Sequence, residues 1–406
     1  MNKHASALGR SSGNRRPVAA HPAAPAAKSH AAGSKLPVQG APFVPEHFPF
    51  QPLPAPLGKP PYRFDLTDLL HADAVAAIQK SGKLVFHTIG DTGDARGKQM
   101  DFVAEMMTAD YDASAAGEAP AFFYHLGDVV YFAGDIQDYG ACFYETYAEY
   151  PGLIVSIPGN HDCQPDDPQD GPVDPNKKPL DGWIQNFMSP TPNKQGSLKT
   201  TSQRTQMNLP NVYWTFTMPL VTVVGLFSNV SETEAEIHPD QIAWFKGELQ
   251  AADKNKALIV AIHHPPFSGD QEHSGSAAAE KVLFESFAAT GRYPHLILSG
   301  HVHNYQRFTV KESAGPVTCV VAGNGGYSRL GKLHQIGGAY PKTPMQLSNS
   351  LTLENYDQDN FGFVRFEVTA KQITGIYKSA LFGGQQSANP TVMDQFTVDL
   401  KTRAVS

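Results

Sequence analysis

The sequence has few cysteines, no long apolar run and no excess of positive charge. Its three cysteines, Cys142, Cys163 and Cys319, lie far apart without a CxxC spacing, so neither a disulfide framework nor a thiolate metal site is indicated. Any bound metal ion must therefore take oxygen and nitrogen ligands. The net charge of −7 gives no basic surface for nucleic acid, so no nucleic-acid partner is expected.

The sequence also lacks the signals of a membrane or exported protein. No apolar run approaches the roughly 20 residues that a membrane-spanning helix needs. Residues 1–60 contain no uninterrupted apolar stretch of the kind that forms a signal peptide. A cytoplasmic location is therefore the default expectation, and the oligomeric state is left open.

Composition divides the 406 residues into three parts. Residues 1–60 are rich in Ala, Pro, Ser and His, and their Lys and Arg side chains are opposed only by Glu46. Such a segment buries too little apolar area to fold, which predicts a disordered basic leader. A tether for an anionic surface or partner is the alternative. Residues 61–82 form a lead-in segment, and residues 83–400 are expected to form one large domain.

Short apolar runs alternate with segments of helical periodicity along this domain. The expected strands are 84–89, 121–126, 153–157, 221–227, 258–262 and 296–298. The expected helices are 99–107, 136–147, 240–252 and 277–289. This alternation predicts an α/β layered domain.

The pattern changes after residue 318. Expected strands at 319–322, 363–368 and 372–377 follow with little helix between them, which suggests an antiparallel portion that closes a second sheet. Two long irregular segments, 163–179 and 325–360, are expected to be loops that could shape a substrate mouth.

Five expected strands are followed at once by residues that commonly bind metal ions. The blocks are GDTG at 90–93, GDVVY at 127–131, GNHD at 159–162, VAIH at 260–263 and GHVH at 300–303. In an α/β sheet, ligands bind outside the carboxyl ends of the strands, so distant blocks can converge on one crevice. One block alone is weak, because Gly-Asp pairs are common in turns and a lone His is usually structural. The ordered set of five predicts a single polar site.

The series GDxG, GDxxY, GNH[DE], VxxH and GHxH resembles the purple acid phosphatases, a group within the calcineurin-like metallophosphoesterases. The resemblance runs from about residue 83 to residue 377 and includes GDVVYFAG at 127–134, QIAWFKGEL at 241–249 and GHVHNYQR at 300–307. It implies an α/β (α+β) fold of two packed mixed β-sheets flanked by helices, with residues 83–400 as the catalytic domain. Members of that family are often exported, which leaves the location open.

The resemblance also implies two metal ions and their ligands. It assigns Asp91, Tyr131 and His303 to the first ion, Asn160, His263 and His301 to the second, and Asp128 to both. Carboxylate and phenolate oxygens suit iron(III), whereas imidazole and amide groups suit iron(II), zinc or manganese. Two such ions, about 3.5–4 Å apart, can clamp a phosphoryl group and turn a bound water into hydroxide.

Position 93 departs from the pattern of most other metallophosphoesterases. Those proteins place a His two residues after the first Asp, and this chain has Gly93 there. The purple enzymes replace the missing ligand with a Tyr three residues after the bridging Asp, and Tyr131 stands at that position. An aromatic residue that only covers the strand is the alternative for Tyr131, but the absent His favours a ligand.

Two histidines are candidates for a direct role in catalysis. His161, in GNHD, is the nearest candidate general acid for an ester leaving group. His273 lies ten residues after His263, close to where family members carry a His that faces the phosphate, although the spacing differs by about a residue from some relatives. An exposed loop histidine is the alternative for His273.

Other polar residues near the blocks have structural interpretations. The VxxH spacing selects His263 rather than its neighbour His264 as the ligand. The remaining residues are interpreted as core histidines, His87 and His125, and as turn residues, Asp94 and Asp162.

The resulting hypothesis is an acid phosphatase that hydrolyses small phosphomonoesters by direct attack of metal-bound hydroxide. A phosphodiesterase or nucleotide hydrolase on the same core is the alternative, since loops 163–179 and 325–360 could hold a second ester arm. A non-catalytic binding scaffold is a third possibility. It requires eroded ligands, and none of the expected ligands is missing from the sequence.

Overall fold

The structure is a computed structural model that describes residues 36–39, 53–94, 98–115, 117–164, 176–192, 200, 202–228, 236–327, 329–380 and 390–406. These residues belong to one structural unit, Lys35–Ser406. Most of the predicted leader, 1–60, and most of the expected loop 163–179 lie outside the described residues.

The larger sheet has nine strands, and four neighbouring strands near its middle, β8, β9, β10 and β12, run parallel. Every residue of these four strands is buried, which explains their continuous apolar sequences. The order across the sheet is β1 (Arg63–Asp65), β7 (Trp214–Thr217), β8 (Val221–Leu226), β9 (Ala257–Ile262), β10 (Leu296–Ser299), β12 (Val317–Ala322), β11 (Tyr305–Val310), β14 (Leu351–Asp357) and β13 (Met345–Gln346).

The smaller sheet has six strands and is also mixed. Strands β2, β4 and β6 are parallel, and β15, β16 and β17 extend the sheet in antiparallel fashion from β2. Its order is β17 (Thr391–Asp399), β16 (Gln372–Ala380), β15 (Phe361–Thr369), β2 (Lys83–Ile89), β4 (Phe122–His125) and β6 (Leu153–Ser156). The strands β3 (Gly93–Asp94) and β5 (Val130–Tyr131) form a separate, short parallel sheet.

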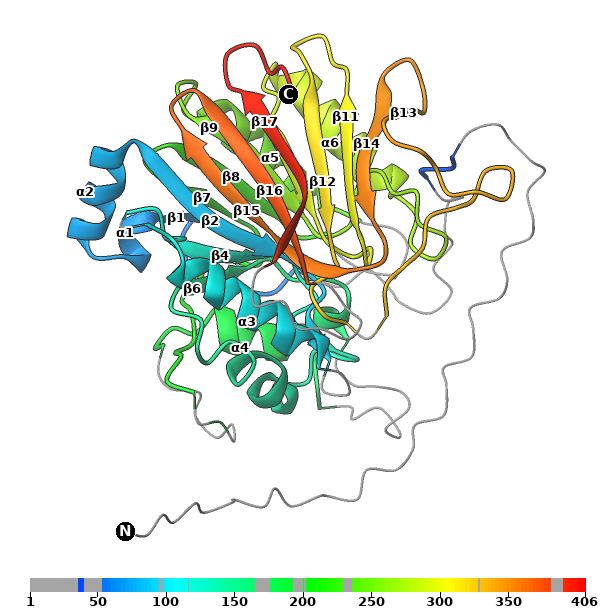
Figure 1. The fold of residues 1–406 in the computed structure, drawn as a ribbon. Helices are drawn as coiled ribbons and strands as arrows, with labels where there is room; N and C mark the ends of the chain where they lie inside the picture. The colour runs from blue at the N-terminus through cyan, green and yellow to red at the C-terminus, as the bar shows by residue number, and fades with distance from the viewer. Residues whose placement is uncertain are drawn as a thin grey trace, which may run out of the picture. The chain divides into compact units, whose positions relative to one another are not determined.

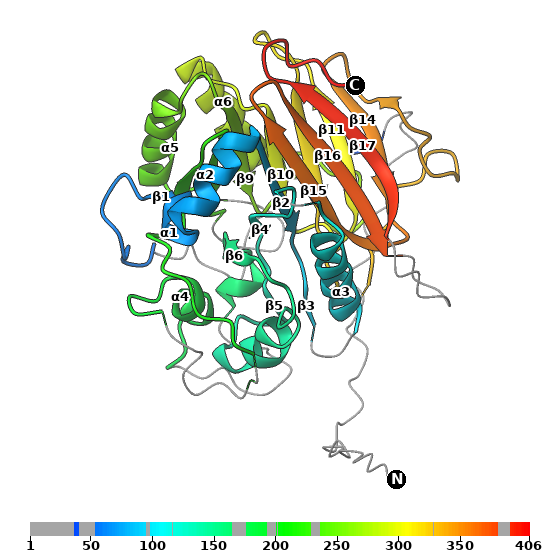
Figure 2. The same cartoon turned by 60° about the vertical axis from the view of Figure 1, so that its left-hand side comes forward.

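Helices cover the outer faces of the two sheets (Figures 1 and 2). Side chains of α5 and α6 share a hydrophobic cluster with β8, β9 and β10, whereas α3 packs against β15 and β16. Ser276 caps α6 by accepting a hydrogen bond from Ala279 N. The helical segments are α1 (Leu66–Leu69), α2 (Ala72–Ser81), α3 (Gln99–Asp112), η1 (Ile136–Asp138), η2 (Gly140–Tyr144), η3 (His161–Cys163), α4 (Asp181–Phe187), α5 (Pro239–Ala251) and α6 (Ala277–Thr290).

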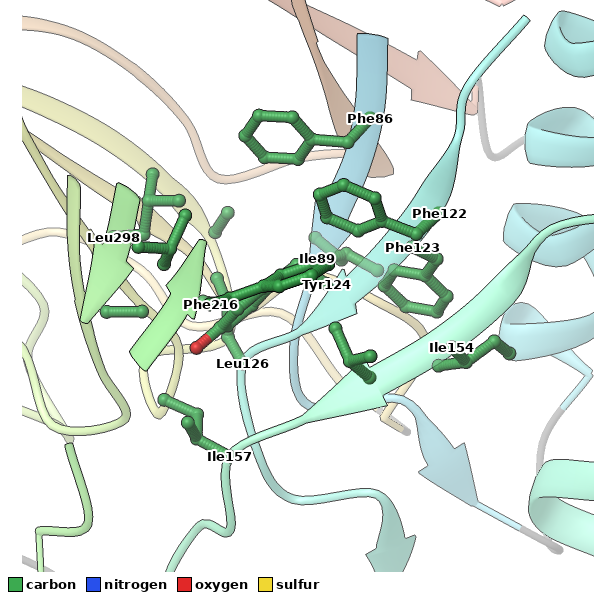
Figure 3. Packing of buried hydrophobic residues seen from close by; sticks show 14 of the residues in the cluster. Phe86, Ile89, Phe122, Phe123, Tyr124, Leu126, Ile154, Ile157, Phe216 and Leu298 are labelled. Carbon is green, nitrogen blue, oxygen red and sulfur yellow. The ribbon is translucent and has the colours of Figure 1, made fainter. Parts of the chain in front are cut away.

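Aromatic side chains fill the space between the sheets (Figure 3). Phe122 of the six-stranded sheet meets Phe216 of the nine-stranded sheet with ring centroids 5.0 Å apart, and Phe86 stacks on Phe122 at 5.1 Å. Tyr124 points towards the nine-stranded sheet, where a Cβ atom at Gly225 would lie 2.6 Å from its hydroxyl oxygen. This tight packing fixes the parallel strands of one sheet against those of the other.

The structure confirms the predicted fold class and the six strands predicted before residue 300. The predicted helix at 136–147 is confirmed only in part, since the stretch contains the 3₁₀-helix η1 and the π-helix η2 rather than an α-helix. Apolar spacing alone does not separate these helix types from an α-helix. Residues 319–322 belong to β12, which lies in the nine-stranded sheet rather than in the second sheet. There β12 pairs in parallel with β10 and in antiparallel fashion with β11. Segment 325–360 is not entirely irregular, since it contains β13 and β14.

The N-terminal parts contribute to this unit more than composition suggests. The lead-in 61–82 contains β1, which pairs with β7 at the edge of the larger sheet, as well as α1 and α2. Within the predicted leader, Leu36 is buried and Gln39 forms a parallel bridge with Gly275. None of the helices in the described ranges is both long and apolar enough to span a bilayer.

Candidate metal centre

The candidate ligands of the five sequence blocks lie just beyond the ends of strands, as predicted. Asp91, Asp128 and Asn160 follow β2, β4 and β6 of the smaller sheet. His263 and His301 follow β9 and β10 of the larger sheet. These five strands are parallel members of their sheets, so the facing sheets bring their carboxyl-end loops together.

One group of side chains surrounds the amide oxygen of Asn160. This Oδ1 atom lies 3.1 Å from His263 Nε2 and 3.0 Å from His301 Nδ1. Asp128, His263 and His301 are buried, and each offers a ligand atom within 4.8 Å of the others. His263 Nδ1 lies 2.8 Å from the carbonyl oxygen of Leu126, which orients the ring with Nε2 towards the group. The group therefore fits one metal ion with imidazole, amide and carboxylate ligands.

A second group lies around the Tyr131 hydroxyl. This oxygen is 3.1 Å from Asp91 Oδ1 and 3.4 Å from His303 Nε2. His303 Nε2 is in turn 3.7 Å from Asp91 Oδ1. All three side chains are buried, so a carboxylate, a phenol and an imidazole converge away from bulk water.

The Asp128 carboxylate joins the two groups. Its Oδ2 atom accepts a hydrogen bond from the Tyr131 hydroxyl at 2.7 Å and lies 3.3 Å from His263 Nε2. Its Oδ1 atom accepts a hydrogen bond from the backbone N–H of His161 at 2.8 Å. Asp128 therefore contacts side chains of both groups.

Backbone strain is concentrated at three of these residues. Asp91, Asp128 and His301 have φ angles of 59°, 53° and 67°, which are rare for residues other than glycine. Such conformations persist where the surrounding structure over-determines them, and they cluster at functional sites. Here the positive φ angles turn the backbone sharply where the chain leaves each strand.

Asp162 holds two of the loops together. Its Oδ2 atom accepts hydrogen bonds from the backbone N–H groups of Asp128 and Gly159, both at 2.8 Å. Its Oδ1 atom accepts a third from Val129 N at 3.0 Å. Burial and the nearby Asp128 charge raise the pKa of Asp162 to about 7. This geometry agrees with the turn role predicted for Asp162.

The backbone at Gly93 leaves no room for a side chain. Gly93 lies opposite Val130 in the β3–β5 pair, and a Cβ atom at Gly93 would stand 2.1 Å from the carbonyl oxygen of Val129. A histidine therefore could not occupy position 93 without moving one of the two segments. Tyr131, on the paired strand β5, brings its hydroxyl to the Asp91 carboxylate instead.

Burial and mutual electrostatic interactions shift the pKa values of Asp91, Asp128 and His263. Burial raises the pKa of Asp91 well above its usual range. Burial also favours the neutral acid at Asp128, but the positive charge of His263 holds the pKa of Asp128 well below its usual range. Burial likewise opposes charge on His263, yet the Asp128 carboxylate raises the pKa of His263 to about 9. Burial and the carboxylate charges raise the pKa of the Tyr131 hydroxyl.

Both candidate catalytic histidines lie beside the two groups. The His161 ring is 4.5 Å from the Tyr131 ring, and its Nδ1 atom is 2.8 Å from the carbonyl oxygen of Phe132. The His273 ring centroid lies 4.8 Å from that of His301 and 5.1 Å from that of His303. Burial lowers the pKa of His273 to about 4.

The other histidines make structural contacts. His87 lies 2.8 Å from an Asp110 carboxylate oxygen, and His125 lies 2.9 Å from the Thr92 hydroxyl. His264 packs behind His301, with ring centroids 4.3 Å apart. The side chain of Asp94, predicted to hold a turn, lies outside what the structure describes.

Tyr327 is a residue of the site that sequence reasoning missed. Its ring stacks on Tyr131 with centroids 3.8 Å apart and meets His303 edge-on at 4.7 Å. Its backbone N–H donates to the carbonyl oxygen of Asp91 at 3.0 Å. It follows the glycine-rich turn after β12, which carries no metal-type motif. Only the tertiary contact identifies it.

A sequence model of the calcineurin-like phosphoesterases matches residues 84–305, more than half of the chain. The protein belongs to this family. Its members are metal-dependent phosphoester hydrolases with a dinuclear site, and the matched region contains all five blocks.

Individual relatives are distant. Purple acid phosphatase 22 of Arabidopsis thaliana is 27% identical over 165 residues, which cover 39% of this chain and 34% of that protein. The match thus spans about a third of the relative. A structure of PhoD superposes with a TM-score of 0.53 at 11% identity, covering 80% of this chain and 71% of PhoD. GAP50, described as the anchor in the inner membrane complex of Plasmodium, superposes with a TM-score of 0.50 at 15% identity, covering 77% of this chain and 87% of GAP50. At these identities the superpositions show the fold alone.

The crowding at Gly93 predicts a specific loss of stability. We expect Gly93→Ala to lower the free energy of unfolding by about 1–3 kcal/mol, because the new methyl group overlaps a backbone oxygen. Gly247→Ala, in α5 with open space around it, is the control and should raise stability by about 0.5–1 kcal/mol. Urea denaturation measures both values. A Gly93→Ala protein as stable as wild type would contradict the close approach of β3 and β5.

Proposed function

We propose that this chain is a binuclear acid phosphatase that hydrolyses phosphomonoesters. The observation that carries the proposal is the position of Asp128 Oδ2, 2.7 Å from the Tyr131 hydroxyl and 3.3 Å from His263 Nε2. One carboxylate thereby contacts both groups of candidate ligands. Family membership supports phosphoester hydrolysis, and the distant purple acid phosphatase relative supports the finer assignment.

The chemistry of the two groups supports unlike metal ions. Asp91, Tyr131 and His303 would hold iron(III), because carboxylate and phenolate oxygens are hard, negatively charged ligands. The ligands proposed for iron(II), zinc or manganese are Asn160, His263 and His301. Asp128 would belong to both ions. When bound, the ions supply Lewis acidity that polarises the phosphoryl group and activates the attacking water.

The protein's own side chains then handle the leaving group. The carbonyl oxygen of Phe132 accepts the Nδ1–H of His161, which leaves Nε2 as the nitrogen that exchanges a proton. We assign His161 the role of general acid, which donates the Nε2 proton to the ester oxygen as the P–O bond breaks. We assign His273, whose ring lies beside those of His301 and His303, the role of donating a hydrogen bond to a phosphoryl oxygen.

Loss of a proposed ligand should abolish activity without unfolding the protein. We expect Asn160→Ala to reduce kcat/KM for a phosphomonoester by about two orders of magnitude or more, because its Oδ1 atom meets both imidazoles. Asn255→Ala, on an exposed turn, is the matched control and should behave like wild type. Activity is measured on a panel of monoesters and diesters.

The same panel separates the proposal from its alternative. A preference for diesters in the wild type would favour a phosphodiesterase on this core. Persistent monoesterase activity in folded Asn160→Ala would contradict the ligand assignment. Absence of all hydrolysis in the metal-loaded wild type would favour a binding scaffold.

The general-acid role predicts a dependence on the leaving group. His161→Ala should slow hydrolysis of alkyl phosphates by about 10²–10⁴-fold, because a poor leaving group needs the proton. Activated aryl phosphates should be affected much less. His71→Ala, which removes an exposed histidine before α2, is the control. Equal losses on alkyl and aryl phosphates would argue against His161 as the acid.

A further inference from the structure

Residues 263–276, here called the His273 loop, connect β9 to α6. An internal turn shapes this loop around His273. The Asp270 Oδ1 atom accepts hydrogen bonds from the backbone N–H groups of Glu272 and His273 at 2.8 and 2.9 Å. Gly269 and Ser274 form a bridge across the turn. The position of His273 therefore depends on how the whole turn is held.

The neighbouring parts of the larger sheet hold the His273 loop on one flank. Gln306 Oε1, on β11, accepts a hydrogen bond from Gly269 N at 2.8 Å. Asn304 Nδ2 donates to Asp270 Oδ2 at 2.9 Å. The backbone N–H of Gln271 donates to the carbonyl oxygen of Lys332 at 2.9 Å. These contacts fix the base of the turn and one of its edges.

Residues Leu36–Gln39, drawn in dark blue at the right of Figure 1, also hold the His273 loop. The carbonyl oxygen of Val38 accepts the backbone N–H of Ser268 at 3.0 Å. Gln39 forms a parallel bridge with Gly275 and hydrogen bonds through its side chain to Glu280 of α6. The segment thus contacts the His273 loop both before and after His273.

The surface of the His273 loop is shaped to receive this segment. A Cβ atom at Gly269 would lie 2.7 Å from Leu36 Cδ2, and one at Gly275 would lie 2.4 Å from the carbonyl oxygen of Val38. Leu36 is only 3% exposed and joins the hydrophobic cluster of β8 to β10, α5 and α6. A leucine more than two hundred positions before the loop therefore packs against it as a core residue.

We propose that Leu36–Gln39 is a positioning strap that holds His273 in place beside the metal centre. The strap touches no proposed metal ligand in the described contacts and acts through the His273 loop. Removing its contacts frees the Ser268 N–H and one edge of the turn, which lowers the cost of local opening. The effect on catalysis rests on the proposed function, because it requires that His273 contact the substrate.

The first test is hydrogen exchange of residues 265–276 in the full chain, a readout that needs no activity. Leu36→Ala should speed exchange at Ser268 and His273 by about tenfold, since local opening then requires less free energy. Leu36→Met, of similar volume, should restore slow exchange. If Leu36→Ala unfolds the protein, Leu36→Val, a smaller truncation of the same side chain, tests the same contact with Gly269. Exchange as slow as in the wild type, in whichever truncation variant of Leu36 folds, would overturn the strap.

The second test is a double-mutant cycle on kcat/KM for a phosphomonoester. Leu36→Ala alone should lower kcat/KM about tenfold, because a small misplacement of a positioning group is costly. In a His273→Ala background it should cause no further loss, since both changes remove the same contribution. A full additive loss would show general damage and would contradict the proposal.

Leu249→Ala is the matched control, because Leu249 of α5 is a buried leucine in the same cluster but on a different segment. It should lower stability yet leave kcat/KM and exchange of residues 265–276 unchanged. A parallel loss in Leu249→Ala would overturn the specific role of the strap. If the wild type hydrolyses no phosphate ester, the proposed function fails, and the exchange experiment alone decides whether the strap exists.

Discussion

The contact of Asp128 with both Tyr131 and His263 is the interaction on which the rest of the site depends. Asp128 lies at the end of β4 of the smaller sheet, and His263 lies at the end of β9 of the larger one. The contact therefore exists only because the two sheets pack closely through Phe122 and Phe216. A shift of one sheet would separate a carboxylate from the imidazole that balances its charge. The aromatic core between the sheets thus helps to position the candidate metal ligands.

The fold does not by itself say what the protein does. PhoD and GAP50 share it at 11% and 15% identity, and GAP50 is described as an anchor. Hydrolysis is supported instead by the family match and by side chains that converge in two groups around Asp128. Three of these residues adopt strained backbone conformations, a cost that a purely structural role does not explain.

The sequence predicts the site better than its surroundings because the polar blocks directly follow buried strands. Each block is a local pattern, and the parallel strands carry the blocks to one place. No local sequence pattern marks Tyr327 as a residue of the site, since only its stacking on Tyr131 reveals it. Leu36 is hidden for a similar reason, because a leucine in an Ala- and Pro-rich segment has no periodicity that predicts burial. Strand β14 escapes prediction because its polar residues interrupt the apolar pattern.

Gly93 and Tyr131 determine which ligand types are available on one side of the candidate metal centre. The backbone at Gly93 excludes a side chain, and the Tyr131 hydroxyl reaches Asp91 and Asp128 from the paired strand. The most direct measurement is the visible absorption of iron-loaded protein, compared with Tyr131→Phe at matched iron content. A phenolate bound to iron(III) gives a charge-transfer band, so the wild type should absorb in the visible range and Tyr131→Phe should not. A colourless iron-loaded wild type, or a band that survives in Tyr131→Phe, would contradict the account.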